Sequence, residues 1–516
     1  MSNTAQITDQ THATELDKGF SLRELSDRLG TLELPDDEDI CITGICDDSR
    51  FARPGYAMLC LPRSGKHAGE YAANAAQNGA AAIISVGVDL DAGSSDLNLP
   101  HLHLAQMRQA GQLLRRMFRT EGAGSHIYGI TGTDGKTSIA WMLREALSRY
   151  QDRPVWSCGT LGWMKSPDDI RDIGNTTPSL LTLHAMFASA CLEGVHAVVC
   201  EISSHGIAQS RIAGLDFKTA IWTNMGHDHL QDHGGYASYL ATKAGFVQQV
   251  AAHGGNVVAN ADHADIRKYA PDHTCWYGHG LFRDDVDLAW EQELPGLLRL
   301  KSGDDEIVIE DIPLGDFHAE NVACTALTLM VSMAVPLTGL PMLLDQISAP
   351  PGRMQEVDAG YGQVYIDYAH TPEALQRCLE TARKLTRKRL IMLFGCGGER
   401  DREKRPHMGE IAAELADVVW ITSDNPRGEM PAVIASEIEH GMSQPYRAEV
   451  HLQLDREQAI AEAITCLQDG DMLIIAGKGH EAYMEVCGKR LPWLDADIAT
   501  TYLHRKHGIT EVKACG

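Results

Sequence analysis

Four short apolar runs in the last third of the chain are each followed by a polar or glycine-containing loop. They cover residues 364–368, 389–394, 418–422 and 472–476. Helical patterns separate these runs, and strands that alternate with helices form a parallel sheet. Ligands of such sheets gather at the carboxyl ends of the strands. The pattern therefore predicts a single sheet edge to which all four loops contribute.

Two segments precede this region. Apolar runs at 56–61 and 80–86 flank an alanine-rich helical stretch at 68–79, which is typical of a small α/β domain. From residue 107 onward, strand and helix patterns alternate through a glycine-rich loop and several histidine-rich loops, until proline and glycine at 349–352 mark a boundary. The sequence predicts an α/β protein with three domains: a small N-terminal α/β domain (1–106), a central P-loop ATPase-like domain with a parallel sheet (107–350) and a C-terminal Rossmann-like domain (351–516).

Composition agrees with a globular protein of this size. The chain has 516 residues, of which 44% are hydrophobic and 22% charged, so a disordered chain is excluded. Apolar runs stay shorter than the roughly 18 residues that a membrane span requires. The polar N-terminus lacks the apolar core of a signal peptide, and we expect a cytoplasmic protein without membrane attachment.

Charge and cysteine usage narrow the chemistry. Lys and Arg total 45 against 70 Asp and Glu, which gives a net charge of −25 and disfavours nucleic-acid binding. Any bound phosphate must be held locally by backbone amides, a few cations and a metal ion. The 13 cysteines include no C-x-x-C pair, so neither a disulfide framework nor a zinc site is indicated.

Residues 126–137 are predicted to form a strand followed by a glycine-rich phosphate-binding turn, and a predicted helix at 138–150 comes next. The sequence of this turn is the T-G-T-x-G-K-T variant of the P-loop. Gly132 and Gly135 let successive N–H groups face an anion at the helix N-terminus. Lys136 would reach the β- and γ-phosphates, and the Thr137 hydroxyl would bind Mg²⁺. The predicted ATP-binding residues of this loop are Gly132, Thr133, Asp134, Gly135, Lys136, Thr137 and Ser138.

A second strand, in the segment 196–204, carries Glu201 near its end. An acid at the tip of a strand beside a phosphate loop can hold Mg²⁺ directly or through water. The alternative is a capping or solvated acid, and only a position beside the loop favours the metal.

These features, together with others along the chain, resemble the Mur ligases, and within them the MurE type that adds the third amino acid to UDP-N-acetylmuramoyl-dipeptide. The similarity covers nearly the whole chain from about residue 20. Its landmarks, besides the P-loop, are Asn175-Thr-Thr-Pro178, Glu201-Ile-Ser-Ser-His205, Gln209-Ser-Arg211, Asp228-His229, Lys243, Gly352-Arg353-Met354, Asp367-Tyr-Ala-His-Thr-Pro372, Gly395-Cys-Gly-Gly-Glu-Arg-Asp401, Asp424-Asn-Pro-Arg427 and Ala476-Gly-Lys-Gly-His-Glu481.

The resemblance implies a two-step ligation. A substrate carboxylate attacks the γ-phosphate of ATP to give an acyl phosphate, and an amine then displaces phosphate through a tetrahedral intermediate. Repulsion between the carboxylate and the triphosphate must be offset by cations and metals. By resemblance, Thr137 and Glu201 hold one Mg²⁺, while Glu201, His229 and Lys243 hold a second one. Lys243 would be carbamylated by CO₂, because a carbamate is an anionic oxygen ligand and an ammonium is not.

The resemblance also assigns the remaining nucleotide contacts. Arg353 would reach the ATP phosphates, and Asp367 and His370 would lie where the third domain closes on the nucleotide. Asn260 and Asn321 match family positions near the adenosine. With Lys136, Lys243, His229 and Glu201, Arg353 completes the predicted catalytic set.

The predicted amino-acid pocket indicates which amine enters. A diamino acid with a second carboxylate needs an arginine fork for that carboxylate and acids for its distal amine. The D-N-P-R sequence resembles that of relatives that use meso-diaminopimelate, whereas lysine-adding relatives lack the arginine. The predicted residues are Arg400, Asp424, Asn425, Arg427, Gly477 and Glu481.

The acyl donor would be held by the central domain and the first domain. By resemblance, the central contacts are Asn175, Thr176, Thr177, Ser203, Gln209 and Arg211. Ser49, in the sequence Asp48-Ser49-Arg50, belongs to the first domain, which by resemblance would bind the UDP. Gln209 and Arg211 would share a face on a strand but not on a helix, and the sequence leaves both possibilities open.

Several positions depart from the family pattern. Asp134 replaces the usual Asn of the loop, Phe317-His318 stands where Phe-Asn is usual, and the segment 226–233 differs from the typical R-D-H-L-D-x-H. The leading hypothesis is a monomeric ligase for UDP-MurNAc-L-Ala-D-Glu and meso-diaminopimelate. One alternative is a MurE-like paralogue that uses another acyl donor. An alternative of a different class is a non-catalytic nucleotide-binding regulatory module, which the complete set of P-loop and metal residues disfavours.

Overall fold

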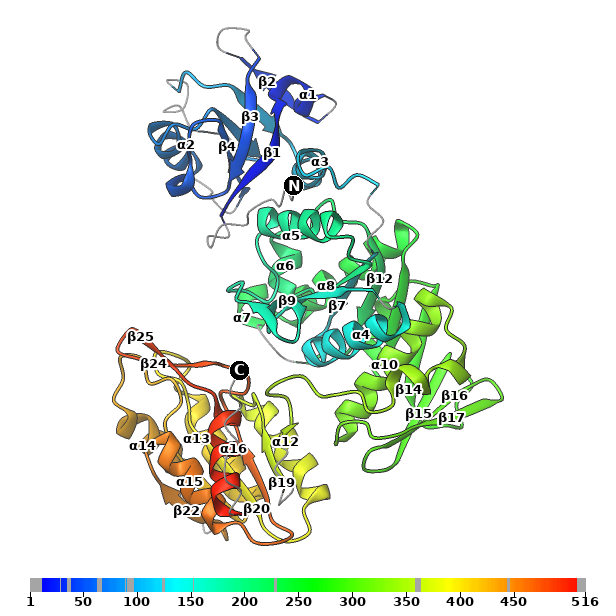
Figure 1. Cartoon of the computed structure of the whole chain (residues 1–516), viewed down its shortest axis with the longest axis vertical. Coiled ribbons are helices and arrows are strands. Elements are labelled where there is room, and N and C mark those ends of the chain that lie inside the picture. Colours follow the sequence, from blue (N-terminus) through cyan, green and yellow to red (C-terminus); the bar gives the residue numbers. More distant parts are fainter. Residues whose placement is uncertain are drawn as a thin grey trace, which may run out of the picture. The chain divides into compact units, whose positions relative to one another are not determined.

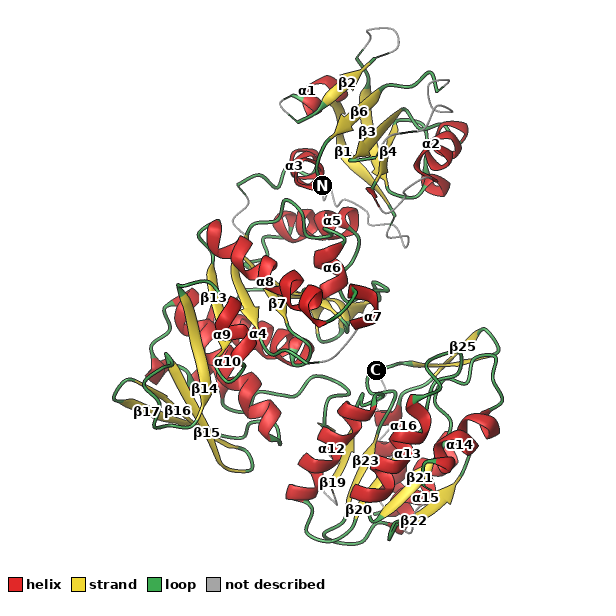
Figure 2. Ribbon diagram, turned by 180° about the vertical axis from the view of Figure 1, so that it is seen from behind, coloured by secondary structure: helices red, strands yellow, loops and turns green. Residues whose placement is uncertain are grey.

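The computed structural model describes residues 12–507, except 28, 35–38, 63–66, 89, 91–96, 123–125, 152, 227–229, 358–362 and 443–445. Three large sheets with flanking helices make up the described part of the chain (Figures 1 and 2). The chain separates into two compact units. The first comprises Met1–Glu291, Leu300–Ile307 and Asn321–Leu344, and the second comprises Gln292–Arg299, Val308–Glu320 and Asp345–Gly516. The three α/β regions are confirmed, while the exact boundaries at 106 and 350 stay a prediction.

The N-terminal sheet has the strand order β1-β3-β4-β5-β6-β2. Its central strands β3 to β6 run parallel, and β1 and β2 pair antiparallel at the two edges. The predicted apolar runs form β4 and β5, and the alanine-rich stretch forms α2. The elements are β1 (Ala13–Ser21), α1 (Leu22–Ser26), β2 (Thr31–Glu33), β3 (Cys41–Cys46), β4 (Tyr56–Cys60), α2 (Ala68–Gln77), β5 (Ala82–Val86), β6 (His101–Leu104) and α3 (Met107–Met117).

The central sheet brings the strands that carry the predicted site side by side. Its order is β10-β9-β8-β11-β7-β12-β13-β14-β15-β16-β17, with parallel pairing from β8 through β15. The strands are β7 (His126–Thr131), β8 (Val155–Gly159), β9 (Gly162–Ser166), β10 (Asp169–Arg171), β11 (Ala197–Glu201), β12 (Phe217–Trp222), β13 (Asn256–Asn260), β14 (Thr274–His279), β15 (Leu288–Leu294), β16 (Leu297–Ser302) and β17 (Asp305–Ile309).

Register places the ends of three strands level with one another. Glu201 of β11 is opposite Ile130 of β7, and Trp222 of β12 is opposite Thr131. The loops after β7, β11 and β12 therefore start at the same edge. The predicted strand at 196–204 ends at Glu201 instead, because Ser203 caps the next helix by accepting a hydrogen bond from the Gly206 N–H.

Helices cover this sheet and supply buried apolar side chains. They are α4 (Lys136–Gln151), α5 (Leu180–Leu192), α6 (Ser204–Ala208), α7 (Leu230–His233), α8 (Tyr236–Ala252), α9 (Ala264–Tyr269), α10 (Asp316–Met333) and α11 (Pro341–Leu344). Helix α5 is apolar on all sides and almost entirely buried, as expected for a core helix. No single helix within the described ranges is long and apolar enough to cross a membrane, although one sharply bent pair meets the criterion together.

The C-terminal sheet confirms the predicted parallel arrangement. In the order β18-β19-β23-β20-β21-β22, all strands after β18 run parallel. The elements are β18 (Gln355–Glu356), β19 (Gln363–Ile366), α12 (Pro372–Leu385), β20 (Leu390–Phe394), α13 (Lys404–Leu415), β21 (Val418–Ile421), α14 (Pro431–His440), β22 (Glu449–Leu452), α15 (Arg456–Cys466), β23 (Met472–Ile475), β24 (Tyr483–Val486), β25 (Lys489–Pro492) and α16 (Asp495–Lys506).

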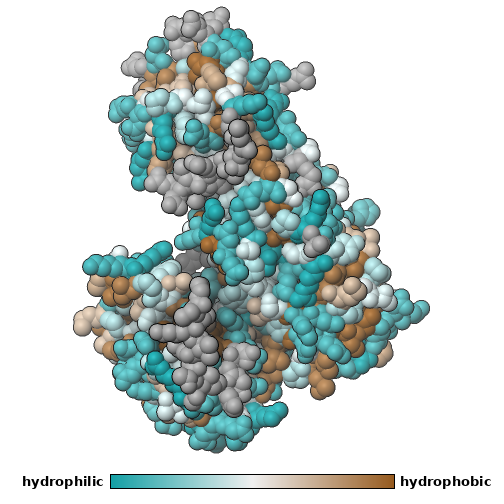
Figure 3. Space-filling view, viewed as in Figure 1, coloured by the Kyte–Doolittle hydropathy of each residue, from teal (hydrophilic) through white to brown (hydrophobic). Residues whose placement is uncertain are grey.

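Both faces of this sheet are buried, which explains the continuous apolar runs in its strands. In β20, Met392 packs in the cluster with α12, α13 and α14, while Ile391 and Leu393 pack in the opposite cluster with α15 and α16. Figure 2 shows helices on the two sides of the sheet. On the surface, Figure 3 shows mainly hydrophilic residues with smaller apolar patches between them.

A buried ion pair joins two helices behind the carboxyl edge of this sheet. The Arg456 guanidinium of α15 donates to both carboxylate oxygens of Asp495 on α16, at 2.9 and 2.6 Å, and neither side chain is exposed. The same guanidinium donates to the carbonyls of Ser423 and Ala476, in the loops after β21 and β23. It thereby links the helix layer to two loops of the predicted amino-acid pocket.

Asp495→Asn should strongly destabilise the second unit, because it leaves the buried Arg456 charge uncompensated. We expect a loss of about 3–5 kcal/mol in the opening free energy of β20 and β23, measured by native-state hydrogen exchange. Asp316→Asn is the matched control, since Asp316 also begins a helix but pairs with Lys384 at an exposed site. That variant should change the opening free energy by less than about 1 kcal/mol. Equal effects of the two variants would contradict a structural role for the buried pair.

Candidate active site

The loop between β7 and α4 has the backbone that its glycines predict. Gly132 and Gly135 have φ angles of +148° and +81°. A Cβ on Gly132 would lie 1.9 Å from the Thr223 hydroxyl, and one on Gly135 would lie 2.7 Å from Oδ1 of Asn321. Both positions therefore require glycine for space as well as for conformation.

Two residues after β12 hold this loop in shape. Oδ1 of Asn224 accepts hydrogen bonds from the N–H groups of Thr133 and Asp134, at 3.0 and 2.8 Å. The Thr223 hydroxyl donates to the carbonyl of Asp134 at 2.6 Å. Sequence reasoning missed both residues, because only the register between β7 and β12 brings them beside the loop.

Two lysine side chains converge on one carbonyl oxygen of the loop. Nζ of Lys136 donates to the carbonyls of Gly132 and Thr133 at 2.9 and 2.7 Å, and Nζ of Lys243 donates to the same Gly132 oxygen at 2.7 Å. Lys243, on α8, is 1% exposed and also lies over the ring of Tyr239. Two positive charges so close repel each other, and an anion bound in the loop would offset that repulsion.

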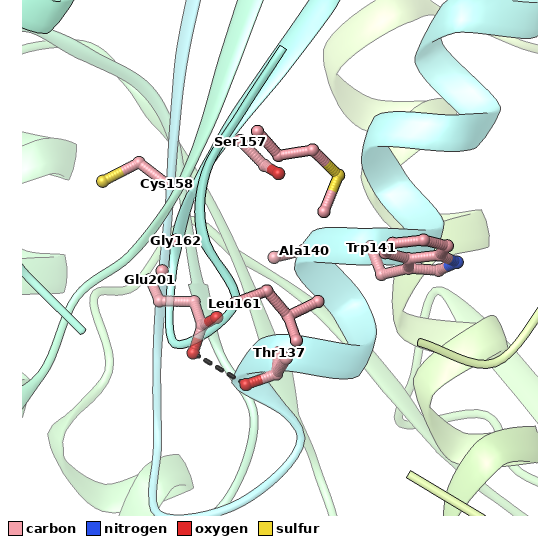
Figure 4. Close-up of a pocket in the computed structure, with 10 residues that line it drawn as sticks. Thr137, Ala140, Trp141, Ser157, Cys158, Leu161, Gly162 and Glu201 are labelled. Atoms are coloured by element: carbon pink, nitrogen blue, oxygen red, sulfur yellow. Dashed lines mark hydrogen bonds between the residues drawn. The ribbon is translucent and has the colours of Figure 1, made fainter. Parts of the chain in front are cut away.

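Glu201 is a buried carboxylate that faces the start of α4. It accepts hydrogen bonds from the Thr137 hydroxyl at 2.9 Å, and from the N–H and hydroxyl of Thr160 at 2.9 and 3.1 Å. Figure 4 shows Glu201 and Thr137 pointing toward each other. A Cβ on Gly159 would lie 2.1 Å from Oε1 of Glu201, so the carboxylate occupies the space that this glycine leaves.

This arrangement fits a divalent cation. Carboxylate and hydroxyl oxygens are the protein ligands that Mg²⁺ prefers, and Thr137 and Glu201 present both within 2.9 Å of each other. The third predicted ligand, His229, lies outside the described residues. Beside the pair is a small pocket lined by Thr137, Ala140, Trp141, Ser157, Cys158, Gly159, Leu161, Gly162, Met164 and Glu201 (Figure 4).

The predicted acyl-donor residues meet around Thr177. Its hydroxyl donates to the Glu201 carbonyl at 2.9 Å and accepts from the Ser203 N–H at 2.9 Å. The hydroxyl of Thr176 is 3.2 Å from that of Thr160, whereas Asn175 is exposed. Thr177 and Ser203 are therefore held beside the backbone of Glu201, and Thr176 contacts Thr160, which donates to the Glu201 carboxylate.

Gln209 and Arg211 lie on neither a strand nor a regular helix. Helix α6 ends at Ala208, and Ser210 has a φ angle of +53° in the turn that follows. The turn lets Arg211 donate twice to Oε1 of Gln209, at 3.0 and 2.8 Å, and once to the Thr177 carbonyl at 2.6 Å. The two side chains thus act as one unit.

The remaining residues predicted for the first unit lie at separate places. Asn260 ends β13, is 1% exposed and accepts a hydrogen bond from the Asp262 N–H. Asn321 lies on α10 against Gly135, and Ser138 is in the first turn of α4. Ser49 is buried in a short 3₁₀ helix (Ser49–Phe51) of the N-terminal domain, where its carbonyl accepts from Asn78.

In the second unit, Arg353 and Asp367 lie in one cluster. The carboxylate of Asp367 accepts from the N–H groups of Met354 and Ala369, both at 2.8 Å, and burial raises the pKa of Asp367. The Arg353 guanidinium lies 4.8 Å from the ring centre of Tyr368. Nδ1 of His370 donates a hydrogen bond to the Tyr368 carbonyl at 2.8 Å, because a carbonyl oxygen can only accept.

His318 contacts the backbone of Arg353. Its Nε2 donates to the Arg353 carbonyl at 3.2 Å. Burial lowers the pKa of His318 to about 4, so the ring is neutral near pH 7. A neutral imidazole is an N–H donor at this position, as an asparagine amide would be.

The predicted amino-acid pocket assembles at the carboxyl edge of the second sheet. Asn425 is its hub: its Nδ2 donates to Glu481 at 2.7 Å, and its Oδ1 accepts from Lys478 at 3.0 Å and from the Glu485 N–H at 2.8 Å. Lys478 has no exposed side-chain surface and also donates to Glu481 at 3.1 Å. Sequence reasoning included Lys478 only within a motif and gave no role to Glu485.

Charged groups of both signs surround this hub. Asp424 is 8% exposed, and burial raises its pKa. A Cβ on Gly477 would lie 2.5 Å from Oδ2 of Asp424, so this glycine leaves room for the carboxylate. A Cβ on Gly397 would lie 3.0 Å from Nη1 of Arg427 and 3.6 Å from Cγ of Arg400, so both arginines lie beside this glycine. All six predicted residues therefore lie in one neighbourhood.

Comparisons with known proteins agree with this geometry. The Mur ligase middle domain matches residues 130–329, and the Mur ligase glutamate ligase domain matches residues 352–479. A UDP-N-acetylmuramoyl-L-alanyl-D-glutamate–2,6-diaminopimelate ligase of Ectopseudomonas mendocina is 35% identical over 463 residues, which cover 87% of this chain and 92% of the relative. The enzyme of that name from Bacillus licheniformis is 33% identical over 495 residues, 92% of this chain and 96% of the relative.

Solved structures show the same likeness. A structure of UDP-N-acetylmuramoyl-L-alanyl-D-glutamate–2,6-diaminopimelate ligase has a TM-score of 0.65 and 28% identity, and covers 90% of this chain and 95% of that chain. The MurF ligase of Thermotoga maritima in complex with ADP shares the fold at 17% identity, with a TM-score of 0.56 over 90% of this chain and 97% of that chain.

The fold and the matches define the class of protein as the ATP-dependent ligases that form ADP and phosphate. The chain belongs to the Mur ligase family, and the relatives at 33–35% identity over most of its length make it one of the MurE type.

Gly159→Ala should displace the Glu201 carboxylate, because the added methyl group would lie 2.1 Å from Oε1. We expect Mg²⁺-dependent ATP binding to weaken by at least about tenfold, as for loss of a residue that orients a metal ligand. Calorimetric titration with and without Mg²⁺ measures this. Gly245→Ala on α8 is the control, since nothing lies within 4 Å of the added carbon. Unchanged binding by Gly159→Ala would contradict the assigned place of the metal.

Proposed function

We propose that this chain joins UDP-MurNAc-L-Ala-D-Glu to meso-diaminopimelate with release of ADP and phosphate, as a step of peptidoglycan precursor synthesis. It would act as a monomer in the cytoplasm on small-molecule substrates. The observation that carries the proposal is the cluster of Arg400, Asp424, Asn425, Arg427 and Glu481 at one sheet edge, in a chain whose relatives bear the name of this ligase.

The P-loop would hold ATP in the first step. The N–H groups around Gly135 and the N-terminus of α4 would bind the phosphates, and the Lys136 ammonium would turn from the Gly132 carbonyl toward them. Asn260 and Asn321 would flank the adenosine. Thr137 and Glu201 would hold Mg²⁺, whose charge would offset that of the phosphates and so lower their repulsion of the substrate carboxylate.

The second metal position involves Lys243. Its ammonium is buried and donates to the Gly132 carbonyl, whereas a carbamate at the same place would supply an anionic oxygen ligand for the metal. With Glu201 and His229, the carbamate would complete the ligand set on the acceptor side. The acyl donor would lie along Thr176, Thr177, Ser203, Gln209 and Arg211, with Asn175 at its exposed end and Ser49 near the UDP.

The amine would enter from the second unit. Arg400 and Arg427 would bind the distal carboxylate of meso-diaminopimelate, and Asp424, Asn425, Gly477 and Glu481 would surround its amino groups. Arg353, Asp367 and His370 of the second unit would contact the nucleotide.

Phosphate release from ATP tests this proposal. The assay contains UDP-MurNAc-L-Ala-D-Glu and, in parallel, meso-diaminopimelate, L-lysine or no amine. We expect release only with meso-diaminopimelate, and Arg427→Ala should raise the KM for that amine by at least about tenfold with little change in the KM for ATP. If protein that binds ATP releases no phosphate with any of the amines, the paralogue with another acyl donor would instead be favoured.

Carbamylation of Lys243 can be measured without turnover. Wild-type protein in ¹³C-bicarbonate should show a carbamate carbon resonance, and Lys243→Ala should lack it and lose activity. Lys268→Ala is the control, because Lys268 lies on α9 near Tyr269 and should leave the resonance intact. A resonance that persists in Lys243→Ala, or is absent from the wild type at high bicarbonate, would refute the assignment.

A further inference from the structure

The hairpin β24–β25 is attached to the loop that carries Arg427. The Arg427 N–H donates to the Glu485 carbonyl at 3.0 Å, and the Cys487 N–H donates to the Arg427 carbonyl at 2.8 Å. Together these bonds make a parallel bridge between Arg427 and Val486. Arg427 has a φ angle of +50°, so its backbone adopts a conformation that the bridge maintains.

The side chain of Arg427 is fixed at two of its three nitrogens. Nε donates to Oε2 of Glu485 at 3.1 Å, and Nη1 donates to the Gly398 carbonyl at 2.8 Å. Within the described ranges Nη2 has no hydrogen-bond partner. Both charged side chains are partly exposed, at 17% for Arg427 and 26% for Glu485. The Nη2 group is therefore left for another partner, and it can donate hydrogen bonds to a carboxylate.

The other acids of the pocket are bound elsewhere. Glu481 accepts from Asn425 and Lys478, and Asp424 accepts from the Asn425 N–H at 2.6 Å. Glu485 is thus the acid that contacts the Arg427 side chain. An arginine side chain without such a contact keeps several rotamers, and ordering it on binding costs affinity.

We propose that Glu485 is a positioning residue for Arg427, which holds the guanidinium ready for the distal carboxylate of the incoming amine and so strengthens selection against amines that lack this group. This inference rests on the proposed function and adds to it a residue that acts through Arg427 rather than on the substrate. A residue with this role should change the KM for meso-diaminopimelate and leave the KM for ATP unchanged.

Glu485→Ala should raise the KM for meso-diaminopimelate by about tenfold with kcat within about twofold, because one charge-assisted hydrogen bond of Arg427 is lost. The KM for ATP should stay constant. Glu485→Gln, whose amide oxygen can still accept from Nε, should restore part of the affinity. Any residual use of L-lysine should be unaffected, since lysine has no distal carboxylate. Glu449→Ala on β22 removes an exposed acid of the same unit and should behave as wild type.

A double-mutant cycle separates positioning from direct contact. In an Arg427→Ala background, Glu485→Ala should have no further effect on the KM for meso-diaminopimelate. A further tenfold rise there would show that Glu485 acts on the amine itself, and a wild-type KM in the single variant would show that it does not act at all. Either result overturns the proposal.

A readout without substrate keeps this inference separate from the proposed function. In ¹⁵N-labelled protein, the arginine Nε–H resonance that disappears in Arg427→Ala should exchange slowly with solvent in the wild type and rapidly in Glu485→Ala. Equal exchange in both overturns the positioning role. Absence of phosphate release by the wild type with meso-diaminopimelate would overturn the proposed function. The exchange measurement would still test whether Glu485 holds the Arg427 side chain in place.

Discussion

The carbonyl oxygen of Gly132 accepts hydrogen bonds from two lysine ammonium groups, and this concentration of positive charge lies at the glycine-rich loop on which the predicted nucleotide site depends. Lys136 comes from the loop itself, while Lys243 comes from α8 and is buried. Across the loop, the Glu201 carboxylate is held by hydroxyl and N–H donors rather than by either lysine. Separated charges of this kind suit a site for phosphates and Mg²⁺, because the anion and the metal would each find a partner already in place.

Both units use the carboxyl edge of a parallel sheet, but they solve different electrostatic problems there. In the first unit, two lysines, the Thr137 hydroxyl and the Glu201 carboxylate lie beside the glycine-rich loop, an arrangement that suits a phosphate group and a divalent cation. The second must bind a zwitterionic amine, so its acids and bases occur in contacting pairs, such as Lys478 with Glu481 and Arg427 with Glu485. Paired charges keep the pocket near neutrality while each member can still meet a substrate group of opposite sign.

The sheets and the loops that carry motifs could be predicted from the sequence. Continuous apolar runs indicate strands that are buried on both faces, and glycines indicate where the backbone must turn sharply. It was not sufficient for residues that reach the site only through strand register. Thr160 touches Glu201 because β8 lies beside β11, and Asn224 touches the P-loop because β12 lies beside β7. Neither Thr160 nor Asn224 lies in a motif that the sequence alone singles out. The turn at Gln209 and Arg211 was also beyond prediction, since both alternatives assumed regular structure and Ser210 adopts a positive φ angle.

Two departures from the family pattern, at Asp134 and His318, are chemically compatible with activity. The N–H of Asp134 donates to Oδ1 of Asn224 and its carbonyl accepts from the Thr223 hydroxyl, and both are backbone bonds that an amide or a carboxylate side chain can accompany. At His318 a buried neutral imidazole donates to the Arg353 carbonyl, which preserves an N–H donor where an asparagine amide is usual. A chain that had lost turnover would be free to lose such bonds. Their retention, together with the intact contact between Thr137 and Glu201, favours a ligase over a regulatory module that only binds nucleotide.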